Sequence, residues 1–101
     1  MILTTTTSIE DYKIIEYIGI VSGTAVNMQK MTMTFNMQKY YTGISGSIEE
    51  VRNAALEQLK ANAAKMNANA VVGINIDIEM KSADNTIVVS VSGTAVNILK
   101  K

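Results

Sequence analysis

The clearest hydrophobic pattern lies in the middle of the chain. Apolar residues recur there every three or four positions, at Val51, Ala55, Leu59, Ala63 and Met66, with Leu56 alongside. This spacing gathers them on one face of a helix. Ser47 and Glu50 have the spacing of a capping box. Asn67 suits the left-handed conformation that often ends a helix. The pattern predicts an amphipathic helix from Ser47 to Met66.

Three other stretches have the composition or alternation of strands. Residues 12–29 place Ile14, Ile18 and Ile20 on one side and Ile15, Tyr17 and Val21 on the other, so both faces are largely apolar. Residues 71–80 place Ile74, Ile76, Ile78 and Met80 opposite Asn75, Asp77 and Glu79. Residues 86–99 form the last strand, after a turn at 81–86.

The remaining segments are polar or interrupted. Residues 1–11 are a Thr-rich lead-in that adds at most a short edge strand. Residues 31–38, MTMTFNMQ, alternate apolar and polar side chains, which predicts a half-buried strand or strand-like arm. Residues 39–46 contain Gly43 and Gly46 and are predicted to form a loop.

The element order predicts a single α+β domain over residues 1–101. Its two-layer β-α-β-β core has one helix packed on a mostly antiparallel sheet, with extra short strands that serve oligomer assembly. One helix covers only one face of a sheet, so the other face and the long edges need a partner. A chain of 101 residues buries a modest core. Self-association is therefore expected.

Composition narrows the functional classes. The chain has no His, Cys, Trp or Pro, and its nine basic and nine acidic residues cancel. Without Cys there is no thiolate nucleophile or finger-type zinc site, and without His the usual general base near neutral pH is missing. We expect no enzyme, no cofactor and no nucleic-acid partner. The N-terminus lacks the features of a secretory signal and no apolar run suits a membrane span, so a cytoplasmic location is expected.

The heptapeptide VSGTAVN occurs twice, at Val21–Asn27 and Val91–Asn97. Similarity does not extend beyond it, so a tandem duplication is not indicated. Gly23 and Gly93 each interrupt a strand, which usually marks a bulge, a bend or a close backbone approach. We expect both strands to bend there and at least one to pair with a neighbouring subunit. Replacing either glycine with Val is then expected to break assembly before it unfolds the helix.

Several residue groups are candidate sites, each with a plain structural alternative. Met28, Met31, Met33 and Met37 could bring together thioethers, which favour Cu(I), or could fill a core or interface. Asp77 and Glu79 share a strand face that Glu16 could approach. Such carboxylates could bind a hard cation or transfer protons, or could simply be solvated.

The stretch GISGS, residues 43–47, could seat an anion on the helix N-terminus or be only a loop and cap. It lacks the P-loop pattern. A nucleic-acid clamp at this loop would have only Lys39 nearby.

Three stretches carry a family resemblance. NANAVVGINIDIE at 67–79 and VSVSGTAV at 89–96 resemble motifs of the YbjQ-like family of small uncharacterised proteins, and IGIVSGTAV at 18–26 resembles its first strand. The resemblance covers residues 4–98. It implies a dodecin-like subunit fold and assembly into a ring that is typically a pentamer. The family is also described as heavy-metal-binding. Asn67 replaces the family's usual Gly, and the segment before the helix is short and Met-rich.

The expected function is therefore a non-enzymatic, ring-forming homo-oligomer, a pentamer by resemblance, with no assigned cellular role. The alternative is a metal- or small-ligand-binding protein that uses the Met28–Met37 arm, the strand carboxylates or the ring pore. The sequence assigns no catalytic or cofactor-binding residue, and it does not identify metal ligands.

Overall fold

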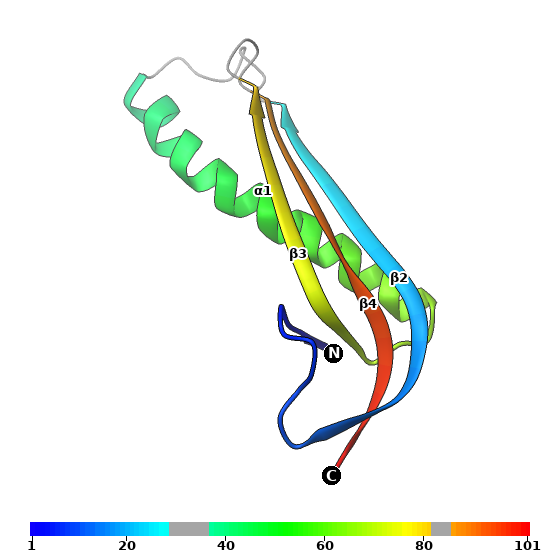
Figure 1. Cartoon of the computed structure of the whole chain (residues 1–101). Coiled ribbons are helices and arrows are strands. Elements are labelled where there is room, and N and C mark those ends of the chain that lie inside the picture. Colours follow the sequence, from blue (N-terminus) through cyan, green and yellow to red (C-terminus); the bar gives the residue numbers. More distant parts are fainter. Residues whose placement is uncertain (29–36, 82–85) are drawn as a thin grey trace.

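The computed structural model describes residues 1–28, 37–81 and 86–101. Five elements follow in the order β1 (Ile2–Leu3), β2 (Tyr12–Met28), α1 (Met37–Lys65), β3 (Ala70–Lys81) and β4 (Thr86–Lys100). The strands form one sheet in the order β1-β3-β4-β2. The long strands β3, β4 and β2 lie side by side and antiparallel (Figure 1). The short β1 pairs parallel to β3. The predicted α+β class and mostly antiparallel sheet are confirmed.

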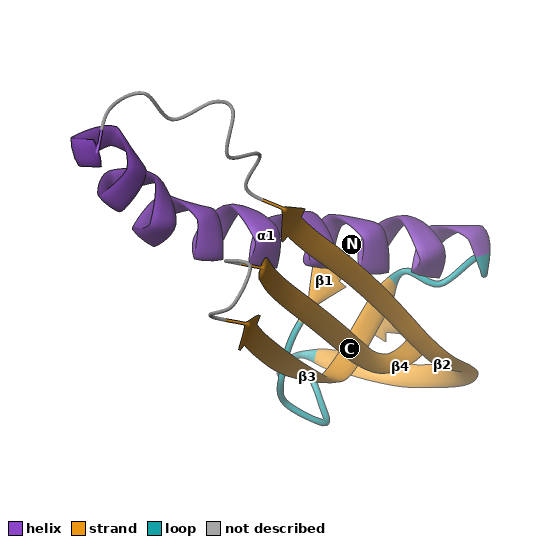
Figure 2. Ribbon diagram, turned by 90° about the horizontal axis from the view of Figure 1, so that it is seen from above, coloured by secondary structure: helices purple, strands orange, loops and turns teal. Residues whose placement is uncertain are grey.

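The helix forms a second layer on one face of this sheet (Figures 1 and 2). It packs mainly on β2 and β4 and touches β3 much less. The predicted apolar stripe supplies the contact, because Ala55, Leu59 and Ala63 are fully buried and Val51 nearly so. They meet Val21, Val89 and Val91 from the sheet. Burying a side chain such as Leu59 contributes about 1.5–3 kcal/mol, so this stripe anchors α1.

The helix begins earlier than the sequence pattern indicates. It starts at Met37, so residues 39–46 are helical and the predicted loop there is wrong. Ser47 and Glu50 therefore lie inside the helix and do not cap it. A glycine costs a helix only about 1 kcal/mol relative to Ala, so Gly43 and Gly46 weaken α1 without ending it. Of the predicted strand-like arm 31–38, residues 31–36 lie outside the described residues, and Met37 and Gln38 are helical.

The predicted helix end is confirmed. Asn67 has a φ of 64°, in the left-handed region. The Ala68 N–H donates to the Ala63 carbonyl at 3.1 Å and the Asn67 N–H to the Ala64 carbonyl at 3.0 Å. This is the Schellman arrangement, which satisfies the last helical carbonyls and turns the chain back toward the sheet.

Part of the second sheet face is covered by the chain itself. Residues 1–11 run along the start of β3, where the Thr4 N–H donates to the Val71 carbonyl at 3.0 Å. A small second core forms there from Ala70, Val72, Val96 and Ile98, with Ile2, Ile9, Tyr12 and Ile14 packed against it. The expectation that this whole face awaits a partner is therefore wrong for the part formed by the start of β3 and the end of β4. The predicted short edge strand is β1.

The expected sidedness of β2 is wrong because two bulges interrupt it. The register with β4 shifts between Ile14 and Glu16 and again between Tyr17 and Gly19. Each extra residue reverses the alternation of side chains. Ile14 consequently joins the second core, whereas Ile18 lies on the helix side with Val21.

The first three residues of the two heptapeptides pair with each other. Ser22 faces Ser92 at the centre, and on either side a glycine faces a valine, as Val21 with Gly93 and Gly23 with Val91. The ladder between β2 and β4 has no register shift at either glycine. A bulge in β2 or β4 at these positions is therefore wrong, although β3 bulges beside Gly93, where its register with β4 shifts between Val72 and Asn75. The predicted close approach is right and lies within the chain.

Each glycine makes room for a different neighbour. A Cβ on Gly23 would collide with the Ala55 carbonyl oxygen and lie 2.7 Å from the Leu59 nitrogen, both in the backbone of α1. A Cβ on Gly93 would lie 2.7 Å from the Val71 Cγ1 and 3.0 Å from the Val72 carbonyl oxygen. The expectation that Gly23→Val would spare the helix is wrong, because the helix backbone itself occupies that space.

Candidate functional site

One candidate surface is the edge of β2, where α1 reaches over the strand. The Thr24 N–H donates to Gln58 Oε1 at 2.6 Å, and Asn62 Nδ2 donates to the Ser22 carbonyl at 2.8 Å. These backbone groups point away from β4, toward the outside of the sheet. Gln58 and Asn62 are four residues apart and so lie on the same side of the helix. Two side-chain amides thus occupy this stretch of the β2 edge.

The opposite edge of the sheet is open over its second half. Along β3 the N-terminal segment accepts hydrogen bonds from the Gly73 and Ile74 N–H groups, at 2.7 and 3.0 Å. Beyond Ile74 the alternation of backbone bonds directs Asn75, Asp77 and Glu79 toward β4. The residues between them, Ile76, Ile78 and Met80, therefore point their N–H and C=O groups outward. We call residues 75–81 the open β3 edge.

Apolar side chains accompany this open backbone. Ile76, Ile78 and Met80 are 38%, 41% and 59% exposed. They face the helix side of the sheet, because they pair with the buried Val91, Val89 and Ile87. The sequence correctly placed them on one face, but α1 lies over β2 and β4 and leaves them uncovered.

A second exposed apolar surface lies on the first half of β2. Tyr17 is 70% and Ile20 is 84% exposed. They face the side of the sheet away from the helix, since their partners Val96 and Thr94 lie on that side. The two exposed apolar surfaces thus lie on opposite edges and opposite faces of the sheet.

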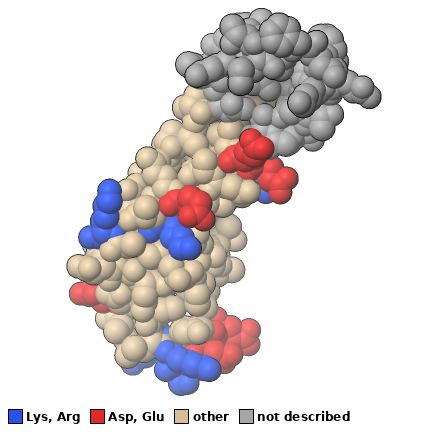
Figure 3. Space-filling view, turned by 180° about the vertical axis from the view of Figure 1, so that it is seen from behind, with Lys and Arg blue, Asp and Glu red and all other residues tan. Residues whose placement is uncertain are grey.

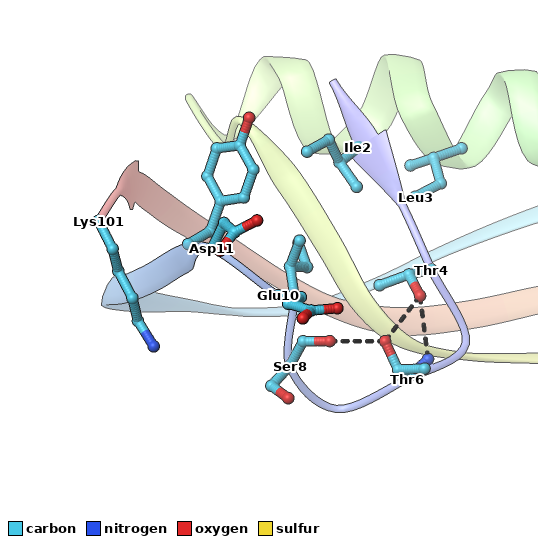
Figure 4. Close-up of a pocket in the computed structure, with 10 residues that line it drawn as sticks. Ile2, Leu3, Thr4, Thr6, Ser8, Glu10, Asp11 and Lys101 are labelled. Atoms are coloured by element: carbon cyan, nitrogen blue, oxygen red, sulfur yellow. Dashed lines mark hydrogen bonds between the residues drawn. The ribbon is translucent and has the colours of Figure 1, made fainter.

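A hollow of about 820 Å³ lies under the N-terminal segment, beside the C-terminal end (Figure 4). Its apolar wall includes Ile2, Leu3, Ile9 and Tyr12, and its polar wall includes Thr4, Thr6, Ser8, Glu10, Asp11 and Lys101. The hydroxyls bond within the wall, because Thr6 Oγ1 donates to the Ser8 carbonyl at 2.6 Å and the Thr6 N–H donates to Thr4 Oγ1 at 3.1 Å. This mixed wall suits a small amphipathic molecule.

The carboxylates considered from the sequence do not form one site. Asp77 and Glu79 are exposed on the face away from the helix, beside Ser90 and Val88. Glu16 Oε1 instead accepts a hydrogen bond from Asn97 Nδ2 at 2.8 Å. Asn97 is separated from Ser90 along β4 by roughly 23 Å at ~3.3 Å per residue. The expected approach of Glu16 to the other two carboxylates is wrong.

The residues do not fit a heavy-metal site in the part of the chain that the structure describes. No group of three or more His, Cys, Asp or Glu residues lies close enough there to hold an ion. Of the four methionines, Met31 and Met33 lie outside the described residues, and Met28 and Met37 fall at the ends of β2 and α1. The anion seat at residues 43–47 is also wrong, because these residues lie inside α1.

The sequence did not identify Gln58, Asn62 or the hollow. A polar i, i+4 pair flanking the buried Leu59 was the available signal, but helix surfaces carry many such pairs and only the fold places this one at a strand edge.

Among residues 1–28, 37–81 and 86–101, no helix is both long and apolar enough to cross a membrane.

The architecture defines a class of small α+β proteins with one long helix across a bulged antiparallel sheet. A solved structure from Pediococcus pentosaceus, described as a protein of unknown function in the DUF74 family, has this fold, with a TM-score of 0.70, 20% identity and 98% of each chain covered. The family model YbjQ_1, described as "Putative heavy-metal-binding", matches residues 1–99. The chain belongs to this family, as the resemblance indicated.

Relatives extend over nearly the whole chain. A UPF0145 protein of Clostridium botulinum is 39% identical, covering 95% of this chain and 97% of its own length. Another from Bacillus cereus is also 39% identical, covering 97% and 100%. A third, from Acetivibrio thermocellus, is 37% identical, covering 97% and 99%. Their names give no enzymatic activity, so the family is one of uncharacterised role.

Proposed function

We propose that the protein is a non-enzymatic homo-oligomer whose copies join head to tail into a ring. The observation that carries this proposal is the pair of unlike apolar surfaces at opposite edges of the sheet. One is the open β3 edge with Ile76, Ile78 and Met80, and the other is the first half of β2 with Tyr17 and Ile20. A contact between two different surfaces is heterologous, and heterologous contacts generate a ring when the rotation closes.

The charge of the protein favours association between identical copies. The formal net charge is zero, so copies do not repel one another as highly charged chains do. On the face shown in Figure 3 the basic and acidic residues are interspersed among uncharged ones, without a broad basic area of the kind that binds nucleic acid. A pentamer is the ring size that the family resemblance implies.

In this proposal the protein is one YbjQ-like domain over residues 1–101. It works in the cytoplasm and has no nucleic-acid or membrane partner. The support for a non-enzymatic role is compositional. The chain lacks His and Cys, the residues that most often act as general base and as an activated thiol nucleophile near neutral pH.

Native mass spectrometry of the purified protein tests this proposal. We expect one species containing five chains of 10.9 kDa. Met80→Asp should dissociate it, because a charge would enter a buried interface. Leu99→Asp is the matched control, since Leu99 is equally exposed at 59% but lies outside both surfaces. A monomer, or a dimer that pairs like surfaces, would contradict the ring.

A second candidate is small-ligand binding, favoured by the hollow under residues 1–11. Glu10 and Asp11 beside an apolar wall suit a short alkyl amine better than an alkyl carboxylate. Butylamine should raise the unfolding temperature of the protein more than butyrate does, and Glu10→Gln should reduce the difference. Equal effects of both compounds would contradict a ligand site of this kind.

A further inference from the structure

The two hydrogen bonds from side-chain amides at the β2 edge have the pattern that a neighbouring strand would make. They engage the carbonyl of Ser22 and the N–H of Thr24, the groups that flank Gly23. In a parallel ladder, one residue of the added strand donates to the carbonyl before the facing residue and accepts from the N–H after it. Asn62 Nδ2 and Gln58 Oε1 make these two bonds. The pair therefore imitates one residue of a parallel strand facing Gly23.

The fold holds this pair firmly in place. Leu59, next to Gln58 in α1, is fully buried, as are Ala55 and Ala63. The missing side chain of Gly23 lets the helix backbone approach the strand, since a Cβ there would lie 2.7 Å from the Leu59 nitrogen. The short side chains of Gln58 and Asn62 can then reach the strand edge. Gly23 and the amide pair thus form one structural unit.

A second amide in the molecule acts in the same way. Asn69 Oδ1 accepts from the Ile98 N–H at 2.8 Å, and Asn69 Nδ2 donates to the Ile98 carbonyl at 3.0 Å. This side chain replaces a residue of β3 just before that strand begins. Side-chain amides therefore complete the sheet at two places where no strand is present, which indicates that the bonds at Gly23 have the same structural purpose.

We propose that Gln58 and Asn62 cap the edge of β2 and so decide where a second copy can join the sheet. Unpaired strand edges recruit other chains, and proteins commonly cover them. An incoming strand would have to displace both amides to pair at Ser22–Thr24. The cap confines a neighbour to the first half of β2 and to the open β3 edge. This choice of surfaces rests on the proposed self-association, whereas the cap itself does not.

The β3 edge differs because it already accepts an added strand. The chain's own N-terminal segment extends it, with the Gly73 N–H donating to the Thr6 carbonyl at 2.7 Å. No such side-chain cap is found along Asn75–Met80 among the residues that the structure describes. A second copy can therefore continue on this edge the pairing that residues 2–6 begin.

Three variants test the cap by amide hydrogen exchange. Gln58→Glu keeps an acceptor oxygen, so the Thr24 amide should exchange as in the unchanged protein. Gln58→Ala/Asn62→Ala removes the cap, and the Thr24 amide should exchange at least about tenfold faster, as expected for an edge N–H that has lost its acceptor. Asn53→Ala/Glu57→Ala is the matched control, because these residues have the same spacing on an exposed part of α1. Unchanged exchange in the cap variant would overturn the proposal.

Native mass spectrometry over a range of concentrations tests whether the cap decides where a second copy joins the sheet, which we call the steering of assembly. The unchanged protein and the control variant should give the same species, whereas the cap variant should add larger species that grow with concentration. Faster exchange without any change in size would overturn the steering. If the unchanged protein is a monomer, the ring fails, and the cap is still tested by hydrogen exchange. A cap variant that then begins to self-associate supports the role of the cap in blocking the β2 edge, and one that exchanges faster but stays monomeric overturns that role and leaves the cap itself in place.

Discussion

The segments Val21–Asn27 and Val91–Asn97 have the same seven residues in different surroundings. The first lies in the edge strand β2 and the second in β4, which has neighbours on both sides. Val26 is 52% exposed, whereas its counterpart Val96 is completely buried against the N-terminal segment. Gly23 meets the helix backbone, whereas Gly93 meets Val71 and the chain of β3. The same residues thus serve two different packing requirements.

The antiparallel pairing explains why one sequence suits both strands. Around the central Ser22 and Ser92, the first Val of each segment faces the Gly of the other. On the helix side of the sheet, large and small residues alternate across the pair, which lets α1 settle against β2. The repetition therefore follows from local packing within one chain.

The largest expected effect comes from the first glycine. Gly23→Ala should lower the free energy of unfolding by about 3 kcal/mol, at the upper end of the usual cost of overpacking. The reason is that the new Cβ meets backbone atoms of Ala55 and Leu59, which move only if the helix shifts. Urea unfolding at fixed protein concentration measures the change. A loss below about 1 kcal/mol would show that α1 is loosely seated.

Sequence patterns predicted the parts of the fold that depend on periodic burial. The stripe of Val51, Ala55, Leu59 and Ala63 and the left-handed Asn67 appear where the sequence places them. The start of α1 could not be found in this way, because glycine lowers helix stability by about 1 kcal/mol without forbidding the helix.

The candidate site was less predictable. Its apolar members Ile76, Ile78 and Met80 were assigned correctly to one face of β3, but their exposure depends on where α1 crosses the sheet. Two bulges, at Ile15 and Ile18, each reverse the side-chain alternation of β2. The first has no distinct residue signature, whereas Gly19, with a φ of 156°, follows the second and was the available signal for it. The amide pair requires the position of Gly23 relative to α1, which is a tertiary contact.

The next prediction compares Val26 and Val96, the sixth residues of the two segments. Val96→Ala should cost about 2 kcal/mol, because a fully buried side chain loses its contacts. Val26→Ala should change the free energy of unfolding by less than about 0.5 kcal/mol, as is usual for exposed positions. Thermal and urea unfolding of both variants measure this difference. Equal losses would mean that a second copy buries Val26 as deeply as the N-terminal segment buries Val96.

The smallest expected effect is that of the second glycine. Gly93→Ala brings a Cβ to 2.7 Å from the Val71 Cγ1 and 3.0 Å from the Val72 carbonyl oxygen. The nearest contact is a side-chain methyl group, which yields more easily than the backbone atoms facing Gly23. Replacing glycine also restricts the unfolded chain, which offsets the strain by about 0.4–1 kcal/mol. We expect a net loss of about 1 kcal/mol in urea unfolding. A loss equal to that of Gly23→Ala would mean that the bulge of β3 beside Gly93 is as rigid as the helix.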